Sequence, residues 1–142
     1  AGVMFVAAEL GRRGLIALPT IRNTEGVDLI VSEPMGGRSV SIQVKTSQSH
    51  RKKWLLTKRS EKLKAPGLFY VLVNLGLPGT LPEYHVVPSK TVARRIAKSH
   101  RDWLREPRRD GKRHKDNPLR NFWDEKHEFR DRWDLLGLKV VE

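Results

Sequence analysis

Apolar residues near the start of the chain recur at the intervals of one helix face, at Val3, Val6, Ala7 and Leu10. This spacing predicts a helix over residues 2–13, and Gly14 stands where a left-handed residue commonly ends a helix. The next segment, Leu15–Leu18, has the length and composition of a short strand, and Pro19 ends it.

The segment Ser39–Lys45 alternates apolar and polar residues, which is the pattern of a strand with one buried face. Its apolar face comprises Val40, Ile42 and Val44, and its polar face comprises Ser41, Gln43 and Lys45. A turn rich in proline and glycine, residues 34–37, joins it to a shorter predicted strand, Asp28–Val31. The two segments therefore predict an antiparallel hairpin.

Two further strands and a helix are expected in the middle of the chain. Leu68–Leu75 is apolar on both faces, which is typical of an interior strand, and Tyr84–Val87 follows after a Gly/Pro-rich turn. Ser89 is a natural N-cap for a helix that runs to about Leu104. The apolar stripe of that helix would comprise Val92, Ile96, Trp103 and Leu104.

The last part of the chain begins with a charged loop, residues 106–117. Aromatic and apolar residues then recur at roughly helical intervals, at Phe122, Phe129, Trp133 and Leu136. They predict a C-terminal helix capped by Gly137, which would either form a homodimer interface or cover the sheet. The elements together predict one α/β domain over residues 1–142, with a core of about 1–104 and a basic loop and C-terminal helix over 105–142.

The formal net charge of +12 indicates a polyanionic partner, most commonly nucleic acid inside cells. A charge that serves solubility alone is the open alternative. The chain has no cysteine, no visible secretory signal and no apolar run near the roughly 20 residues that cross a bilayer. These features favour the cytoplasm and exclude disulfides, thiolate metal sites and membrane insertion.

The predicted hairpin brings a carboxylate and an amide together. A turn centred between Met35 and Gly36 places Val31 opposite Val40 and Asp28 opposite Gln43. Lys45 then lies on the same face as Gln43, roughly 6.5 Å further along the strand. Oxygen ligands of this kind suit Mg²⁺, with Mn²⁺ as an alternative, and a lysine beside them can orient water or offset phosphate charge.

The segments Gly26-Val27-Asp28 and Ile42-Gln43-Val44-Lys45 resemble the motif of the PD-(D/E)xK nuclease superfamily, which includes restriction endonucleases and archaeal Holliday-junction resolvases. The resemblance implies a restriction-endonuclease-like core, with a mixed sheet of about four to five strands between helices. It also implies Mg²⁺-dependent hydrolysis of phosphodiester bonds in duplex or branched DNA. Glu9, on the first helix, takes the place of a further acidic residue that joins the catalytic and metal site in this superfamily. The chain departs from the motif at Val27, where proline is expected, and at Gln43, where an acid is expected.

Basic and hydroxyl residues after this motif are candidates for binding the nucleic-acid backbone: Thr46, Ser47, Arg51, Lys52, Lys53, Lys58 and Arg59. A second set, Arg108, Arg109, Lys112 and Arg113, lies in the charged loop. The competing interpretation is a solvated surface. Trp54, amid these charges, either stacks on a base or packs in the core with Leu55 and Leu56, and core packing is favoured.

The other chemistry-bearing residues form no recognisable motif. The histidines, at 50, 85, 100, 114 and 127, show no short paired spacing, so no zinc site is predicted. No glycine-rich phosphate loop opens a helix, so no nucleotide cofactor is predicted. Two alternatives to a nuclease remain: a nucleic-acid-binding module that has lost cleavage, favoured by Gln43, and a basic RNA-binding protein, favoured by charge alone. Target and pathway are not specified by these residues.

Overall fold

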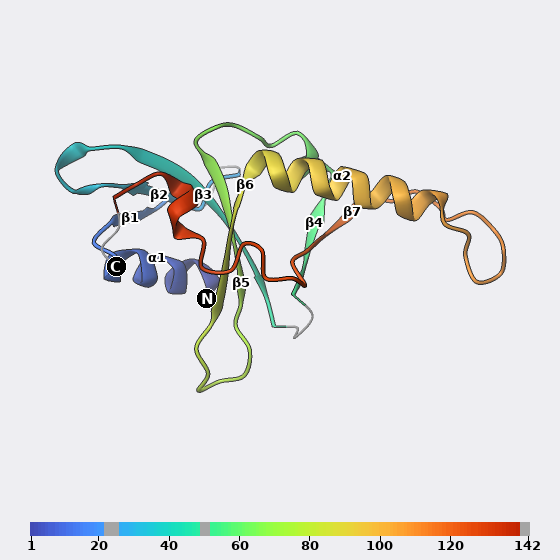
Figure 1. Cartoon of the computed structure of the whole chain (residues 1–142), viewed down its shortest axis with the longest axis horizontal. Helices are drawn as coiled ribbons and strands as arrows, with labels where there is room; N and C mark the ends of the chain where they lie inside the picture. Colours follow the sequence, from blue (N-terminus) through green and yellow to red (C-terminus); the bar gives the residue numbers. More distant parts are fainter. Residues whose placement is uncertain (22–25, 49–51, 140–142) are drawn as a thin grey trace.

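The computed structural model describes residues 1–21, 26–48 and 52–139 of the chain (Figure 1). Its elements, in chain order, are α1 (Gly2–Arg12), β1 (Ile16–Pro19), β2 (Leu29–Ser32), η1 (Pro34–Gly36), β3 (Ser39–Ser47), β4 (Lys53–Thr57), η2 (Lys58–Glu61), β5 (Leu68–Asn74), β6 (Glu83–Pro88), α2 (Ser89–Arg105), β7 (Leu119–Trp123) and η3 (Trp133–Leu136). The predicted first helix is confirmed, and Gly14 has the left-handed φ of 80° expected after its end.

A mixed sheet forms the centre of the molecule. Its strands lie in the order β1-β2-β3-β5-β6, and all neighbours are antiparallel except β3 and β5, which are parallel. Parallel neighbours need a crossover connection, and here it contains β4 and η2. β4 pairs with β7 in a separate two-stranded sheet. The expected α/β class with a mixed sheet is therefore confirmed.

The register of the β2–β3 hairpin is the predicted one. Val31 lies opposite Val40, and Leu29 lies opposite Ile42. The turn reverses the chain through two left-handed residues, Met35 with a φ of 64° and Gly36 with a φ of 77°. This register matters for function because it decides which residue of β3 stands beside Asp28.

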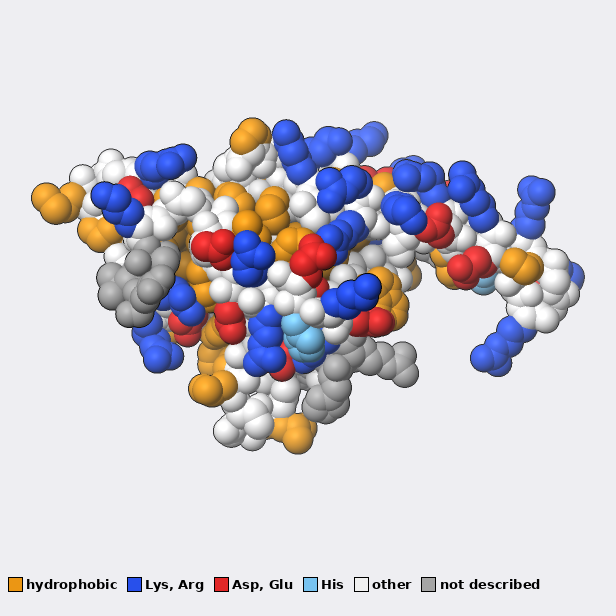
Figure 2. All heavy atoms as spheres, in the orientation of Figure 1, with side chains coloured by type: hydrophobic (Ala, Val, Ile, Leu, Met, Phe, Trp, Pro, Cys, Tyr) orange, Lys and Arg blue, Asp and Glu red, His pale blue; other side chains and the backbone are white. Residues whose placement is uncertain are grey.

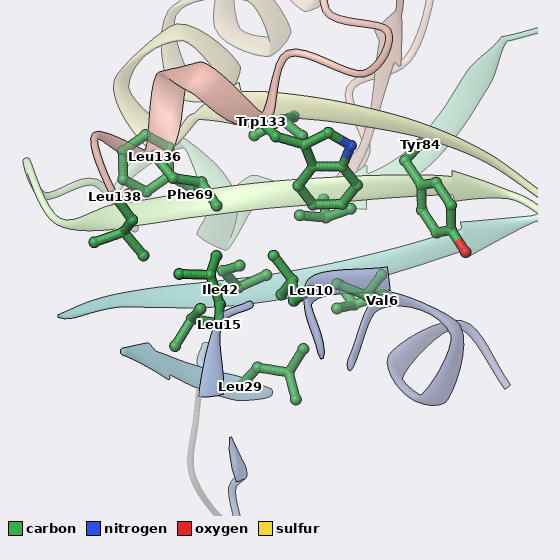
Figure 3. Close-up of a cluster of buried hydrophobic side chains, with 14 of the residues drawn as sticks. Val6, Leu10, Leu15, Leu29, Ile42, Phe69, Tyr84, Trp133, Leu136 and Leu138 are labelled. Atoms are coloured by element: carbon green, nitrogen blue, oxygen red, sulfur yellow. The ribbon is translucent and has the colours of Figure 1, made fainter. Parts of the chain in front are cut away.

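One face of the sheet packs against α1 and η3 (Figure 3). Val6 and Leu10 of α1, together with Trp133 of η3, meet the apolar face of β3 that contains Ile42 and Val44. Burying a large apolar side chain contributes about 1.5–3 kcal/mol, so this layer is a major source of stability. Alternation along β3 places Gln43 and Lys45 on the opposite face.

The opposite face packs against α2 and the β4–β7 sheet. Trp54 and Leu56 of β4 and Val92 and Ile96 of α2 form one cluster with Tyr70 and Leu72 of β5. β5 is buried at every position because both of its faces are covered. The prediction of an interior strand is confirmed, and so is the packing of Trp54 in the core, whereas Leu55 is exposed.

The start of α2 differs from the prediction. Pro88 is the N-cap, and Ser89 is the first helical residue. The Ser89 hydroxyl is used elsewhere: it donates to the Ala65 carbonyl and accepts from the Ala65 N–H, both at 3.0 Å. Trp103 is only half-buried because the second half of α2 extends beyond the sheet (Figure 1).

The α-helix predicted over residues 122–136 is not formed. Phe122 belongs to β7, where it lies opposite Trp54, and η3 is a short 3-10 turn. The carboxylate of Asp124 accepts backbone N–H groups that follow it and closes a turn, and His127 has a left-handed φ of 55° that no α-helix contains. The aromatic residues are buried as expected, and Gly137 ends η3 with a φ of 70°. This segment covers the sheet.

Candidate functional site

Asp28 stands immediately before β2 and is tied to β3 at two points. Its backbone N–H donates to the Ile42 carbonyl at 2.8 Å, and its Oδ2 accepts the Val44 N–H at 2.7 Å. β2 begins only at Leu29, so no carbonyl of β2 lies opposite the Val44 N–H. The Asp28 carboxylate takes the place of that carbonyl as the acceptor. These two bonds hold Asp28 alongside Gln43, as the hairpin register predicts.

A hollow of about 260 Å³ opens on the polar face of β3. Gln43 and Lys45 enter it from β3, and Tyr70 enters it from the neighbouring strand β5. The remaining walls come from the crossover and from the loop before β2: Gly26, Thr57, Arg59, Ser60, Lys62 and Leu63. The hollow therefore exists because the β3–β5 crossover folds back over the polar face of β3.

The charged side chains that line this hollow are all positive among the residues that the structure describes. Lys45, Arg59 and Lys62 line it, and no Asp or Glu side chain within the described ranges does. Lys45 makes no ion pair with any described residue, so its ammonium is available to a ligand. Arg59 has a protein partner, whereas the Lys45 ammonium can attract an anion, and the hydroxyls of Thr57 and Ser60 add hydrogen-bond donors.

Tyr70 supplies a further donor to the hollow. Its side chain is fully buried, and its hydroxyl makes no hydrogen bond of standard geometry in the described structure although Ser60 lies beside it. Burial raises the pKa of Tyr70, and the Ser60 hydroxyl opposes this only in part. The phenol is therefore protonated at neutral pH and can donate to a bound anion.

Glu9 does not reach this site. It lies on α1, which covers the other face of the sheet, and its carboxylate pairs with Arg13 at 3.0 Å and with Arg12 at 3.5 Å. The resemblance implied that an acidic residue of the first helix joins the site, but α1 packs on the face of the sheet opposite to Gln43 and Lys45. Glu9 is a structural partner of arginines on its own helix.

The predicted backbone-binding residues fall into different environments. Lys52 forms an ion pair with Glu83, and the Lys53 ammonium lies 5.0 Å from the Trp123 ring centroid, so both have protein partners. Thr46 lies against α1, where a Cβ on Gly2 would meet its hydroxyl, and Ser47 also has a protein partner. Arg59 lines the hollow, Lys58 is exposed, and Arg51 lies outside the described residues.

The second half of α2 and the loop after it form a basic arm, residues 97–118, that reaches away from the sheet (Figure 1). Figure 2 shows Lys and Arg side chains along this part of the molecule. The candidates Arg108, Arg109, Lys112 and Arg113 are all exposed there.

A groove of about 370 Å³ separates the arm from the β4–β7 sheet, and two half-exposed aromatic side chains line it, Trp103 and Trp123. Sequence reasoning missed this groove because it depends on the unpredicted strands β4 and β7.

Comparisons with known protein families, curated proteins and solved structures found no match to the chain. The resemblance to the PD-(D/E)xK superfamily therefore stays a prediction, and function has to be argued from the site. No helix within the described ranges has the length and apolar character that a membrane crossing requires.

Proposed function

We propose that this chain is a metal-dependent nuclease that hydrolyses phosphodiester bonds in DNA, either duplex or branched. The observation that carries the proposal is the hollow into which Gln43 and Lys45 open, lined by cations and lying beside Asp28. A phosphodiester is the anion that a strongly basic intracellular protein meets most often. The basic arm supports the proposal because it adds an exposed, positively charged surface to a molecule of net charge +12.

The residues of the hollow have distinct roles in this proposal. Lys45 offsets the negative charge that builds on the phosphate, and Arg59 and Lys62 position the adjoining backbone. Tyr70 donates its buried hydroxyl to a phosphate oxygen. Cations and hydrogen-bond donors that face the position where negative charge develops stabilise the transition state, which is the source of their catalytic effect.

Asp28 and Gln43 together offer a magnesium ion the smallest number of protein oxygen ligands that such a site needs. One carboxylate oxygen is oriented by the Val44 N–H, and the other oxygen and the Gln43 amide oxygen would hold the metal. Mg²⁺ commonly binds one or two carboxylates and completes its shell with water and substrate phosphate. When bound, it supplies an activated water and a Lewis acid. Because Glu9 is on the other face, metal affinity depends strongly on the bound DNA.

A nucleic-acid-binding module without cleavage is the second candidate. It is favoured by one observation, the lack of an acidic side chain among the described residues that line the hollow. Both candidates predict binding to DNA that weakens steeply with salt, so salt dependence does not separate them.

The separating experiment is incubation of plasmid and branched oligonucleotide DNA with Mg²⁺ or Mn²⁺, with and without EDTA. The nuclease predicts cleavage that EDTA and Lys45→Met abolish and that the control Lys139→Met leaves unchanged. Lys139 is exposed and is not among the residues that line the hollow. Binding without cleavage in either metal would establish the binding module, and cleavage that survives Lys45→Met would remove the hollow from the mechanism.

A further inference from the structure

Two imidazoles and a carboxylate from distant parts of the sequence meet beside β6. Glu83 and His85 belong to β6, and His127 belongs to the turn that follows β7. One ligand atom from each of the three lies within 4.8 Å of the others. The His85 and His127 rings are stacked, with their centroids 6.2 Å apart. None of these residues lines the hollow of the proposed nuclease.

His85 is oriented as a metal ligand would be. Its ring is fully buried, and its Nδ1 lies 2.5 Å from Oδ2 of Asp124, a carboxylate that is itself 3% exposed. Its Nε2 makes no hydrogen bond within the described structure and lies 3.7 Å from Oε2 of Glu83. A carboxylate that occupies one imidazole nitrogen fixes the ring and leaves the other nitrogen to coordinate, which is the usual support of a metal-binding histidine.

Asp124 also builds the turn that presents His127. Its side chain accepts the N–H groups of Glu128 and Phe129 at 2.8 and 3.1 Å, and its backbone carbonyl accepts the His127 N–H at 3.1 Å. His127 is held there in a left-handed conformation and is exposed to solvent. One buried carboxylate therefore places both imidazoles.

The ammonium of Lys52 occupies a place beside this group that a metal cation would otherwise take. Its ammonium makes a very close ion pair with Oε2 of Glu83, the same oxygen that faces His85. A metal ion that binds this oxygen of Glu83 therefore has to displace the Lys52 ammonium from it.

We propose that Glu83, His85 and His127 form a binding site for a divalent transition metal of the Zn²⁺ class. Two imidazoles with one carboxylate are a ligand set that Zn²⁺ accepts, with a fourth position left for water. Imidazole ligands select such metals over Mg²⁺, whose preferred ligands are oxygens. The bound ion would join the segment after β7 to β6, where the Val86 N–H already donates to the Phe129 carbonyl. This site is independent of the proposed nuclease hollow.

The test is a calorimetric titration of the whole, metal-free chain with Zn²⁺, together with Co²⁺ absorption to report coordination. The main variant is His127→Asn, because asparagine tolerates the left-handed backbone of this position and the fold should be kept. The matched control is His114→Asn, since His114 stacks on Trp103 and lies outside the proposed group of ligands. Lys52→Met removes the competing ammonium.

The wild-type chain is expected to bind one Zn²⁺, and His127→Asn is expected to weaken that binding at least tenfold. His114→Asn leaves it unchanged, and Lys52→Met tightens it several-fold. Circular dichroism of each variant checks that the fold is intact. Absence of zinc binding in the wild type, equal binding by wild type and a folded His127→Asn, or a loss in His114→Asn in place of His127→Asn would each overturn the proposal.

Discussion

The carboxylate of Asp28 accepts the backbone N–H of Val44 at 2.7 Å, and this bond joins the loop before β2 to the strand that carries Gln43 and Lys45. Asp28 therefore has a structural role whether or not it binds a metal. One of its carboxylate oxygens accepts the Val44 N–H of β3, and only the other oxygen is open to a ligand. Substitutions at this position have to separate the two roles.

Asp28→Ala is expected to destabilise the fold, because it leaves the half-buried Val44 N–H without an acceptor. An unsatisfied group of this kind costs about 1–3 kcal/mol. Asp28→Asn keeps a side-chain oxygen for the same bond and should cost less than half as much. Denaturant unfolding of both variants measures the difference, and equal destabilisation by Asn and Ala would contradict the structural role of the bond.

Tyr70→Phe is expected to affect stability and DNA binding in opposite directions. The buried hydroxyl has no hydrogen bond of standard geometry in the described structure, so its removal should leave the free energy of unfolding unchanged or raise it by about 1 kcal/mol. Loss of the donor should weaken DNA binding or cleavage. Parallel unfolding and DNA-binding measurements test this, and weaker folding with unchanged DNA binding would rule out a donor role.

The Lys52–Glu83 ion pair predicts a pH-dependent contribution to stability. Burial of the Glu83 carboxyl raises its pKa, but the hydrogen bond from Lys52 outweighs this and leaves the pKa below its ordinary value of 4.5. A carboxyl whose pKa is lowered on folding stabilises the fold above 4.5, and this contribution disappears as pH falls through the folded value. Lys52→Met should therefore cost about 1 kcal/mol at pH 7, and this cost should shrink as the pH falls below 4.5 through the folded pKa of Glu83. A cost that does not fall with pH would contradict the assignment.

The basic arm is expected to contribute to DNA affinity and little to stability. Replacing Arg108, Arg109, Lys112 and Arg113 with serine removes exposed charges, so the unfolding midpoint should stay the same. Each lost phosphate contact should lower the slope of log affinity against log salt by about 0.9. Arg38→Ser with Lys139→Ser, which removes two exposed cations outside the arm, is the control. An unchanged salt slope in the arm variant would exclude the arm from binding.

The parts of the fold that sequence patterns predicted are those set by neighbouring residues. The β2–β3 register followed from one turn and one alternating strand, and Asp28 consequently lies beside Gln43 as expected. The first helix and the interior strand β5 followed from apolar spacing in the same way. Local spacing also suggested helical intervals after Phe122, but β-pairing with Trp54 and the turn at Asp124 determined that segment.

The features that sequence patterns missed depend on contacts between distant residues. Lys53–Thr57 does alternate, with Trp54 and Leu56 inward and Leu55 outward, but the surrounding lysines and arginines obscured a strand whose partner is far along the chain. His85 and His127 have no motif spacing and are brought together only because the segment after β7 returns to β6. Scanning for short spacings between histidines cannot find a pair of this kind.

The most direct test of the proposed nuclease compares cleavage and binding of the same DNA by wild type and Asp28→Asn in Mg²⁺. The substitution keeps the bond to Val44 but removes the only charge proposed to hold the metal. The account predicts that the cleavage rate falls at least a hundredfold while DNA affinity in EDTA is unchanged or higher, because a negative charge beside the phosphate has been removed. Cleavage at the wild-type rate by Asp28→Asn, or no cleavage by the wild type in any divalent metal, would contradict it.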